Sequence, residues 1–171
     1  MRVSAATNQS NGYVKNRLNP NQDLNNANDF AGRVQLLWEG EDWDALVNIR
    51  QGEQDIRTCF FQHVTTLESG ELSSSSTPNP YLNDAEGNAG YFDNDGDEYA
   101  GDYDRLGHND LSTKGQTLTL KYDGGGVKFT SLTDISTTER DYIEDSDASP
   151  EDYFNFFLTT DAEQLSQEFR F

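Results

Sequence analysis

The sequence has little positive charge, a single cysteine and no long apolar run. Its 171 residues include 12 Lys and Arg against 31 Asp and Glu, which gives a formal net charge of -19. Affinity for nucleic-acid phosphates needs basic patches, so this balance argues against a nucleic-acid partner. Cys59 stands alone and cannot form an internal disulfide. No run of 18 apolar residues occurs, which argues against a transmembrane helix.

Apolar residues are also scarce, at 33% of the chain. Such a fraction approaches the composition of disordered proteins, but those are usually poor in aromatic residues. This chain has 8 Tyr, 10 Phe and 2 Trp. The composition therefore predicts one domain, residues 1–171, in which short apolar strands are separated by long polar loops. The first residues carry one Arg and no apolar core, so they do not resemble a secretory signal.

The clearest local pattern is a β-hairpin over residues 115–136. Alternate side chains on a strand point to opposite faces, so an alternating pattern predicts one apolar and one polar face. Between the two halves, Asp123–Gly126 supplies the positive φ angles that a tight turn needs. Apolar residues take alternate positions in the first half and, less regularly, in the second: Leu118, Leu120, Tyr122, Val127, Phe129 and Ile135. A two-faced hairpin of this kind is not stable alone in water, so its apolar face must meet a core or lipid.

The same alternation predicts six strands in the chain. They lie at about residues 1–7, 30–38, 43–51, 115–122, 127–136 and 164–171. Long polar loops (8–29, 52–114 and 137–163) alternate with tight turns between them. Loops of 27 and 63 residues are unusual in a compact soluble domain but typical of an outer-membrane barrel. We therefore expect an all-β fold, an antiparallel up-and-down meander that forms a partial transmembrane β-barrel with long extracellular loops and short periplasmic turns.

The two faces of the predicted strands have different expected surroundings. Trp38, Trp43 and Tyr122 lie at strand ends, where barrels carry an aromatic girdle near the periplasmic interface. The polar faces are expected to line the lumen, through Arg33, Gln35, Asn48, Arg50, Thr117, Thr119, Lys121, Lys128, Glu168 and Arg170. A solvent-exposed sheet face explains these polar residues equally well. The two later loops hold 18 of the 19 net negative charges.

Several segments, in this order and spacing, resemble part of the β-barrel of TonB-dependent outer-membrane receptors. They are GYVKN at 12–16, RVQLLWE at 33–39, TLTLKYDGGGVKFTSLTDIS at 117–136, RDY at 140–142 with Asp145, Asp147, Ser149 and Pro150, and QLSQEFRF at 164–171. The resemblance extends over nearly the whole chain. Members of this family also have a signal peptide, a TonB box, a plug domain and 22 strands, so the resemblance implies an interior fragment of such a barrel.

The resemblance also implies a function. The whole protein would be a transporter in the bacterial outer membrane that takes up a scarce nutrient, such as a ferric siderophore, cobalamin or an oligosaccharide. Its partners would be TonB and the plug domain, which lie outside this chain, and outer-membrane lipid. Two alternatives stay open: a soluble acidic β-sheet module that binds calcium or glycans, and a porin-like outer-membrane channel.

Few residues indicate a chemical site, and we expect no enzyme and no cofactor. Asp93, Asp95 and Asp97 resemble the start of a calcium loop, but the sixth and twelfth positions hold Glu98 and Asp104 instead of Gly and Glu. A solvated acidic loop fits these residues better than a metal site, and its field could steer a cationic ligand. The remaining candidates, His63, His108 and Cys59, lack the spacing of metal ligands or a nucleophile. Acid pairs such as Asp145 and Asp147 are too common here to indicate catalysis.

Overall fold

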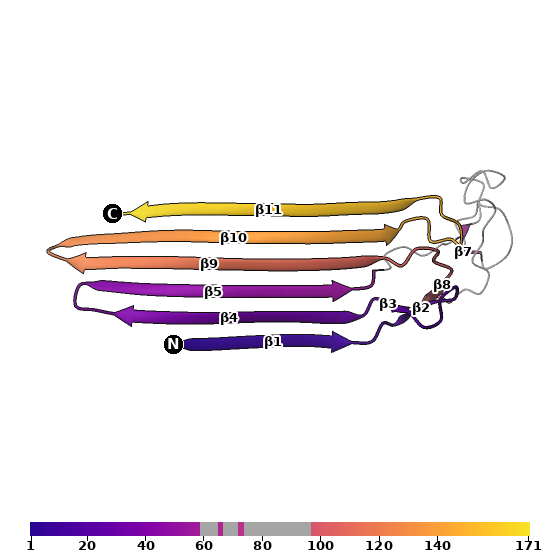
Figure 1. The fold of residues 1–171 in the computed structure, drawn as a ribbon, viewed down its shortest axis with the longest axis horizontal. Coiled ribbons are helices and arrows are strands. Elements are labelled where there is room, and N and C mark those ends of the chain that lie inside the picture. Colours follow the sequence, from indigo (N-terminus) through magenta and orange to yellow (C-terminus); the bar gives the residue numbers. More distant parts are fainter. Residues whose placement is uncertain (59–64, 67–71, 74–96) are drawn as a thin grey trace.

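The fold is a single-layered sheet with a small cluster of loops at one end (Figure 1). A computed structural model describes residues 1–58, 65–66, 72–73 and 97–171. Six long strands follow one another across the sheet in chain order, and every neighbouring pair is antiparallel. They are β1 (Arg2–Ser10), β4 (Ala27–Glu39), β5 (Trp43–Ile56), β9 (His108–Gly124), β10 (Val127–Asp145) and β11 (Asn155–Arg170). The predicted all-β, antiparallel meander is therefore confirmed, and the described residues contain no helix.

Tight turns join the strands at the end of the sheet opposite the loops. Gly125 and Gly126 form the two-residue turn between β9 and β10 with φ angles of 59° and 81°. Positive φ at both central positions is the geometry that matches the twist of a hairpin, and glycine adopts it without steric cost. The neighbouring turn lies between β4 and β5, where the Gly40 N–H donates to the Trp43 carbonyl at 2.8 Å. Both chain ends described here lie at this same end of the sheet (Figure 1).

The strands extend further than their alternation predicted. Loops were expected at 8–29, 52–114 and 137–163, but β5 continues to Ile56, β9 begins at His108 and β10 continues to Asp145. Segment 8–29 likewise contains the end of β1, the start of β4 and two short strands. Polar residues predominate on both faces of these extensions, so no regular apolar period marks them, although the cross-strand pairing of β9 with β5 and β10 continues through them.

Short strands beyond the main sheet build the loop module, which we define as residues 11–26, 97–107 and 146–154. In it β2 (Val14–Asn16) pairs with β3 (Asp23–Leu24) and, in parallel, with β8 (Ala100–Gly101). A further pair, β6 (Thr65–Thr66) and β7 (Leu72–Ser73), is described by its backbone. The loop module joins segments that lie more than 80 residues apart in the sequence.

Hydrophobic burial is confined to the loop module and the adjacent strand ends. Within the described residues the buried apolar cluster consists of Val14, Leu24, Tyr103 and Ala148, with Leu106 packed against it. The Asn16 amide completes this core by donating to the Tyr103 carbonyl at 2.9 Å. No comparable core lies against either face of the described sheet. A domain normally packs a sheet against a second layer, so the surface of this sheet needs another explanation.

Candidate membrane-facing surface

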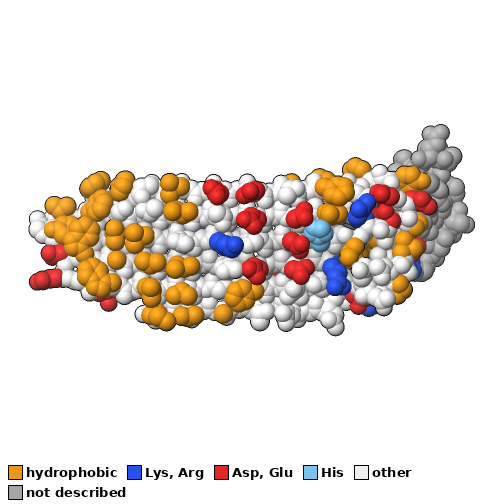
Figure 2. Space-filling model, in the orientation of Figure 1, with side chains coloured by type: hydrophobic (Ala, Val, Ile, Leu, Met, Phe, Trp, Pro, Cys, Tyr) orange, Lys and Arg blue, Asp and Glu red, His pale blue; other side chains and the backbone are white. Residues whose placement is uncertain are grey.

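The strand register gathers the apolar residues of all six strands on one face. Directly opposed residues share a face, and pairs such as Trp38↔Ala45, Val47↔Leu118 and Leu120↔Ser131 fix which face that is. We call the resulting surface the apolar band; it consists of Val3, Ala5, Val34, Leu36, Trp38, Trp43, Ala45, Val47, Ile49, Leu118, Leu120, Tyr122, Val127, Phe129, Ile135, Leu165 and Phe169. Figure 2 shows it over the half of the sheet nearest the turns.

Most side chains of the apolar band are exposed, and the others are half-buried. Trp38 is 60% exposed and Leu165 70%, and even Leu118, in a central strand, is 38% exposed. On β10 the band covers the nine residues from Val127 to Ile135, which is about 26 Å of strand at roughly 3.3 Å per residue. Monomeric soluble proteins rarely expose a contiguous apolar patch larger than a few hundred Å², so this surface requires a nonaqueous environment or a partner.

Aromatic rings gather at the turn end of the apolar band. Trp43 packs on Tyr122 with 4.9 Å between ring centroids, and Phe129 lies 5.0 Å from Phe171 and 6.0 Å from Phe169. These contacts join rings of adjacent strands, as the register requires. Of the three residues predicted for a girdle, Trp43 and Tyr122 lie directly opposite each other, and Trp38 lies opposite Ala45, two residues along the strand.

The opposite face of the sheet is polar and internally bonded. All ten residues predicted to face a lumen lie on this face by the strand register. Among them, Arg50 of β5 donates to both carboxylate oxygens of Asp134 on β10, at 2.8 and 3.0 Å. Thr117, on the strand between, donates to Asp134 at 2.6 Å and accepts from Arg50 at 2.8 Å. This cluster links three neighbouring strands through their side chains.

A second set of bonds on the polar face crosses five strands, and we call it the transverse chain. Asn8 donates to Asp29, Gln54 donates to Asp29 at 3.0 Å, Asn109 donates to Gln54 at 2.6 Å, and Arg140 donates to Asn109 at 2.6 Å. Each member comes from a different strand, β1, β4, β5, β9 and β10. Sequence alternation placed none of these residues together, because the transverse chain lies in strand extensions that were expected to be loops.

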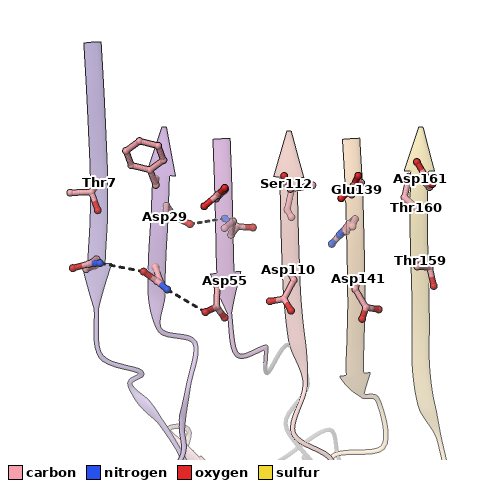
Figure 3. Close-up of a pocket in the computed structure, with 17 residues that line it drawn as sticks. Thr7, Asp29, Asp55, Asp110, Ser112, Glu139, Asp141, Thr159, Thr160 and Asp161 are labelled. Carbon is pink, nitrogen blue, oxygen red and sulfur yellow. Dashed lines mark hydrogen bonds between the residues drawn. The ribbon is translucent and has the colours of Figure 1, made fainter. Parts of the chain in front are cut away.

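Acidic residues follow the apolar band toward the loop module on the same face. This acidic belt consists of Glu53, Asp55, Asp110, Glu139, Asp141, Asp161 and Glu163. An open groove of about 870 Å³ runs over it, and Figure 3 shows Asp55, Asp110, Asp141 and Asp161 along it on neighbouring strands. Beside the belt, His108 Nε2 lies 3.3 Å from Asp141 Oδ2. Figure 2 shows that hydrophobic side chains near the turns are followed along the strands by acidic ones.

Within the described residues, the structure shows no metal or catalytic site at the positions that the sequence suggested for calcium, zinc or nucleophilic chemistry. Asp93, Asp95, His63 and Cys59 lie outside the described residues. Asp97 is exposed, and its Oδ1 accepts the N–H of Tyr99 at 2.9 Å. In the described ranges no three His, Cys, Asp or Glu side chains form a group that could hold a metal ion. Nor does any described helix have the length and apolarity needed to cross a membrane.

Comparison with known proteins gives no family for this chain. No family model, curated protein or solved structure matches it.

Proposed function

We propose that this chain is a segment of an outer-membrane β-barrel in which the apolar band contacts lipid and the polar face lines the lumen. One observation carries the proposal: a single-layered sheet has an exposed apolar band on one face and bonded polar groups on the other. Outer-membrane barrels have this arrangement, with an outward apolar zone about 25 Å tall and aromatic girdles. The membrane-spanning parts are then the strand segments at the level of the band, and the acidic belt and loop module lie outside the hydrocarbon.

The edges of the sheet fit a segment of a larger barrel. β1 and β11 each pair on one side within the described residues, which leaves a row of backbone N–H and C=O groups on the other side. In lipid such groups must be bonded, so a spanning sheet has to close. We therefore place β1 and β11 next to further strands of the same barrel.

We further propose that the whole barrel is a TonB-dependent transporter. The segments that resemble this family support the proposal, together with long strands that end in a loop module on one side and tight turns on the other. Its substrate would be a scarce nutrient such as a ferric siderophore, cobalamin or an oligosaccharide. TonB and the plug domain would act as partners, and the protein would reside in the bacterial outer membrane. A porin-like channel would use the same strands, and a plug domain in the same reading frame distinguishes the two.

A soluble acidic β-sheet module that binds calcium or glycans is the second candidate. The acidic belt and its groove favour it, because carboxylates bind hard cations. It requires another layer to cover the apolar band. Millimolar calcium should then raise the melting temperature where magnesium does not, and the chain should remain monomeric or form a defined oligomer without detergent.

A pair of arginine substitutions tests the membrane assignment. Leu118 belongs to the apolar band, and Thr119, the next residue of β9, lies on the polar face. In the full reading frame, Leu118→Arg should reduce the barrel recovered in outer-membrane fractions, since a cation on the lipid face costs about 2–4 kcal/mol at the bilayer midplane. Thr119→Arg is the matched control and should insert normally. Equal recovery of both variants, in amounts close to the wild type, would contradict lipid contact at Leu118.

A further inference from the structure

Two carboxylates meet in the loop module without a donor between them. Asp145, the last residue of β10, is only 5% exposed, and its Oδ1 accepts the N–H of Ala148 at 2.9 Å. The carboxyl group of Asp104, which follows β8, lies within hydrogen-bonding reach of Asp145. Asp145 Oδ2 and Asp104 Oδ1 are both buried and have no hydrogen-bond partner. A buried, unpaired acceptor is rare in native proteins and needs an explanation.

The surrounding charges do not supply the missing donor. Asp147 is occupied by the N–H groups of Ser149 and Phe154, at 3.0 and 2.7 Å, and adds negative charge. Glu144, which precedes Asp145 on β10, accepts the hydroxyl of Tyr142 at 2.8 Å through Oε2, and its buried Oε1 has no hydrogen-bond partner. Two arginines of the loop module pair with other acids: Arg105 Nη2 with Asp152 at 3.2 Å, and Arg17 Nε with Asp102 at 2.9 Å. Arg105 Nε is buried and bonds to neither Asp104 nor Asp145.

We propose that Asp104 and Asp145 share one proton, and that this proton acts as a pH-sensitive latch holding the β10–β11 loop to the rest of the loop module. Ionising both of these neighbouring carboxylates is unfavourable below neutral pH, and one proton between them gives each buried oxygen a partner. The latch joins segments that also meet where the Asp104 N–H donates to the Ser149 carbonyl at 3.3 Å. The inference does not depend on the transport proposal, since it concerns the loop module alone.

The titration of this pair determines whether low or high pH favours the closed loop. Burial, together with the charges of Asp147 and Asp104, raises the pKa of Asp145 to about 7, against the opposing hydrogen bond from Ala148. When the loop opens, this carboxyl returns to an ordinary pKa near 4. The closed form therefore binds the proton more tightly, and its advantage is complete below about pH 4. It is lost progressively as the pH rises to about 7.

A proton accounts for this pair better than a metal ion does. Calcium takes six to eight oxygen ligands and magnesium six. Here two carboxylates face each other, and the oxygens of Asp147 already accept backbone N–H groups. Calcium remains an explicit outcome of the test.

Hydrogen exchange of the loop 146–154 in the full chain, read by mass spectrometry from pH 4 to pH 8, tests the latch. After correction for the intrinsic exchange rate, opening of the wild-type loop should increase by up to about tenfold per pH unit between pH 4 and pH 7. Asp145→Asn replaces the shared proton with an amide N–H that donates to Asp104, so its protection should stay high and nearly independent of pH. Asp161→Asn removes an exposed acid of the belt and should behave like the wild type.

Three results would overturn the latch. The first is wild-type protection that does not change with pH, and the second is a pH dependence that persists in Asp145→Asn. The third is recovery of wild-type protection at pH 7.5 on adding millimolar calcium, with no such effect in Asp145→Asn, which would identify a cation in place of the proton. Asp104→Asn supplies the same amide from the other side of the pair, so it repeats the test if Asp145→Asn fails to fold.

Discussion

At the scale of single residues, side chains that each hydrogen-bond to two partners link the strands on the polar face. Asn109 is the central example, because it is only 8% exposed and joins β5 to β10 by donating to Gln54 and accepting from Arg140. Both bonds measure 2.6 Å. In a barrel lumen such bonds would keep neighbouring strands aligned where the backbone has no apolar packing to support it.

Substituting Asn109 should destabilise the sheet measurably. Asn109→Ala removes the hydrogen bonds of Gln54 Oε1 and Arg140 Nε, and an unsatisfied buried group costs about 1–3 kcal/mol. Urea unfolding monitored by circular dichroism would measure this loss. Asn28→Ala is a suitable control, because Asn28 makes two exposed bonds of 3.3 Å and its removal should cost less than about 0.5 kcal/mol. Equal losses in the two variants would show that the transverse chain contributes nothing specific.

At the scale of elements, the β9–β10 hairpin is defined by its turn. Gly125 has a φ of 59°, and no atom lies within 4 Å of a Cβ built there, so space does not limit substitution but backbone conformation does. A left-handed conformation costs most L-residues about 1–2 kcal/mol, whereas Asn tolerates it.

The effect of a substitution at this turn on the free energy of unfolding should therefore depend on the backbone conformation that the new residue tolerates, and not on its size. Gly125→Val should lower the free energy of unfolding by about 1–2 kcal/mol, and Gly125→Asn should be close to neutral. Thermal or urea unfolding of both variants would measure the difference. A similar loss for Val and Asn would mean that the turn does not require positive φ at this position.

Sequence alternation identified the parts of the strands at the level of the apolar band. It placed Leu118, Leu120 and Tyr122 on one face and located the turn at Asp123–Gly126, because burial on one face imposes a period of two. It missed the extension of β9 back to His108, where polar residues predominate on both faces and no regular apolar period remains. It also missed the loop module, since the contact of Asn16 with Tyr103 joins residues 87 positions apart and leaves no local pattern.

At the scale of the whole molecule, the side chains change in order along the sheet. Aromatic pairs lie at the turn end of the apolar band. The acidic belt follows the band, and the loop module with its own core comes last. On β10 the strand continues for ten residues beyond Ile135, which is about 33 Å at roughly 3.3 Å per residue. A barrel of this shape would project well beyond the hydrocarbon on the side of its loops, and the negative belt would attract cations there.

The environment of the two tryptophans tests lipid contact of the apolar band most directly. Trp38 and Trp43 are the only two in the chain and both lie at the turn end of the band. With the barrel reconstituted in vesicles, lipids brominated near the headgroup should quench their fluorescence strongly, and the emission should be blue-shifted. Trp38→Phe and Trp43→Phe should each retain a quenched signal from the remaining ring. Emission typical of water-exposed tryptophan, insensitive to brominated lipid and quenched by iodide, would contradict the account.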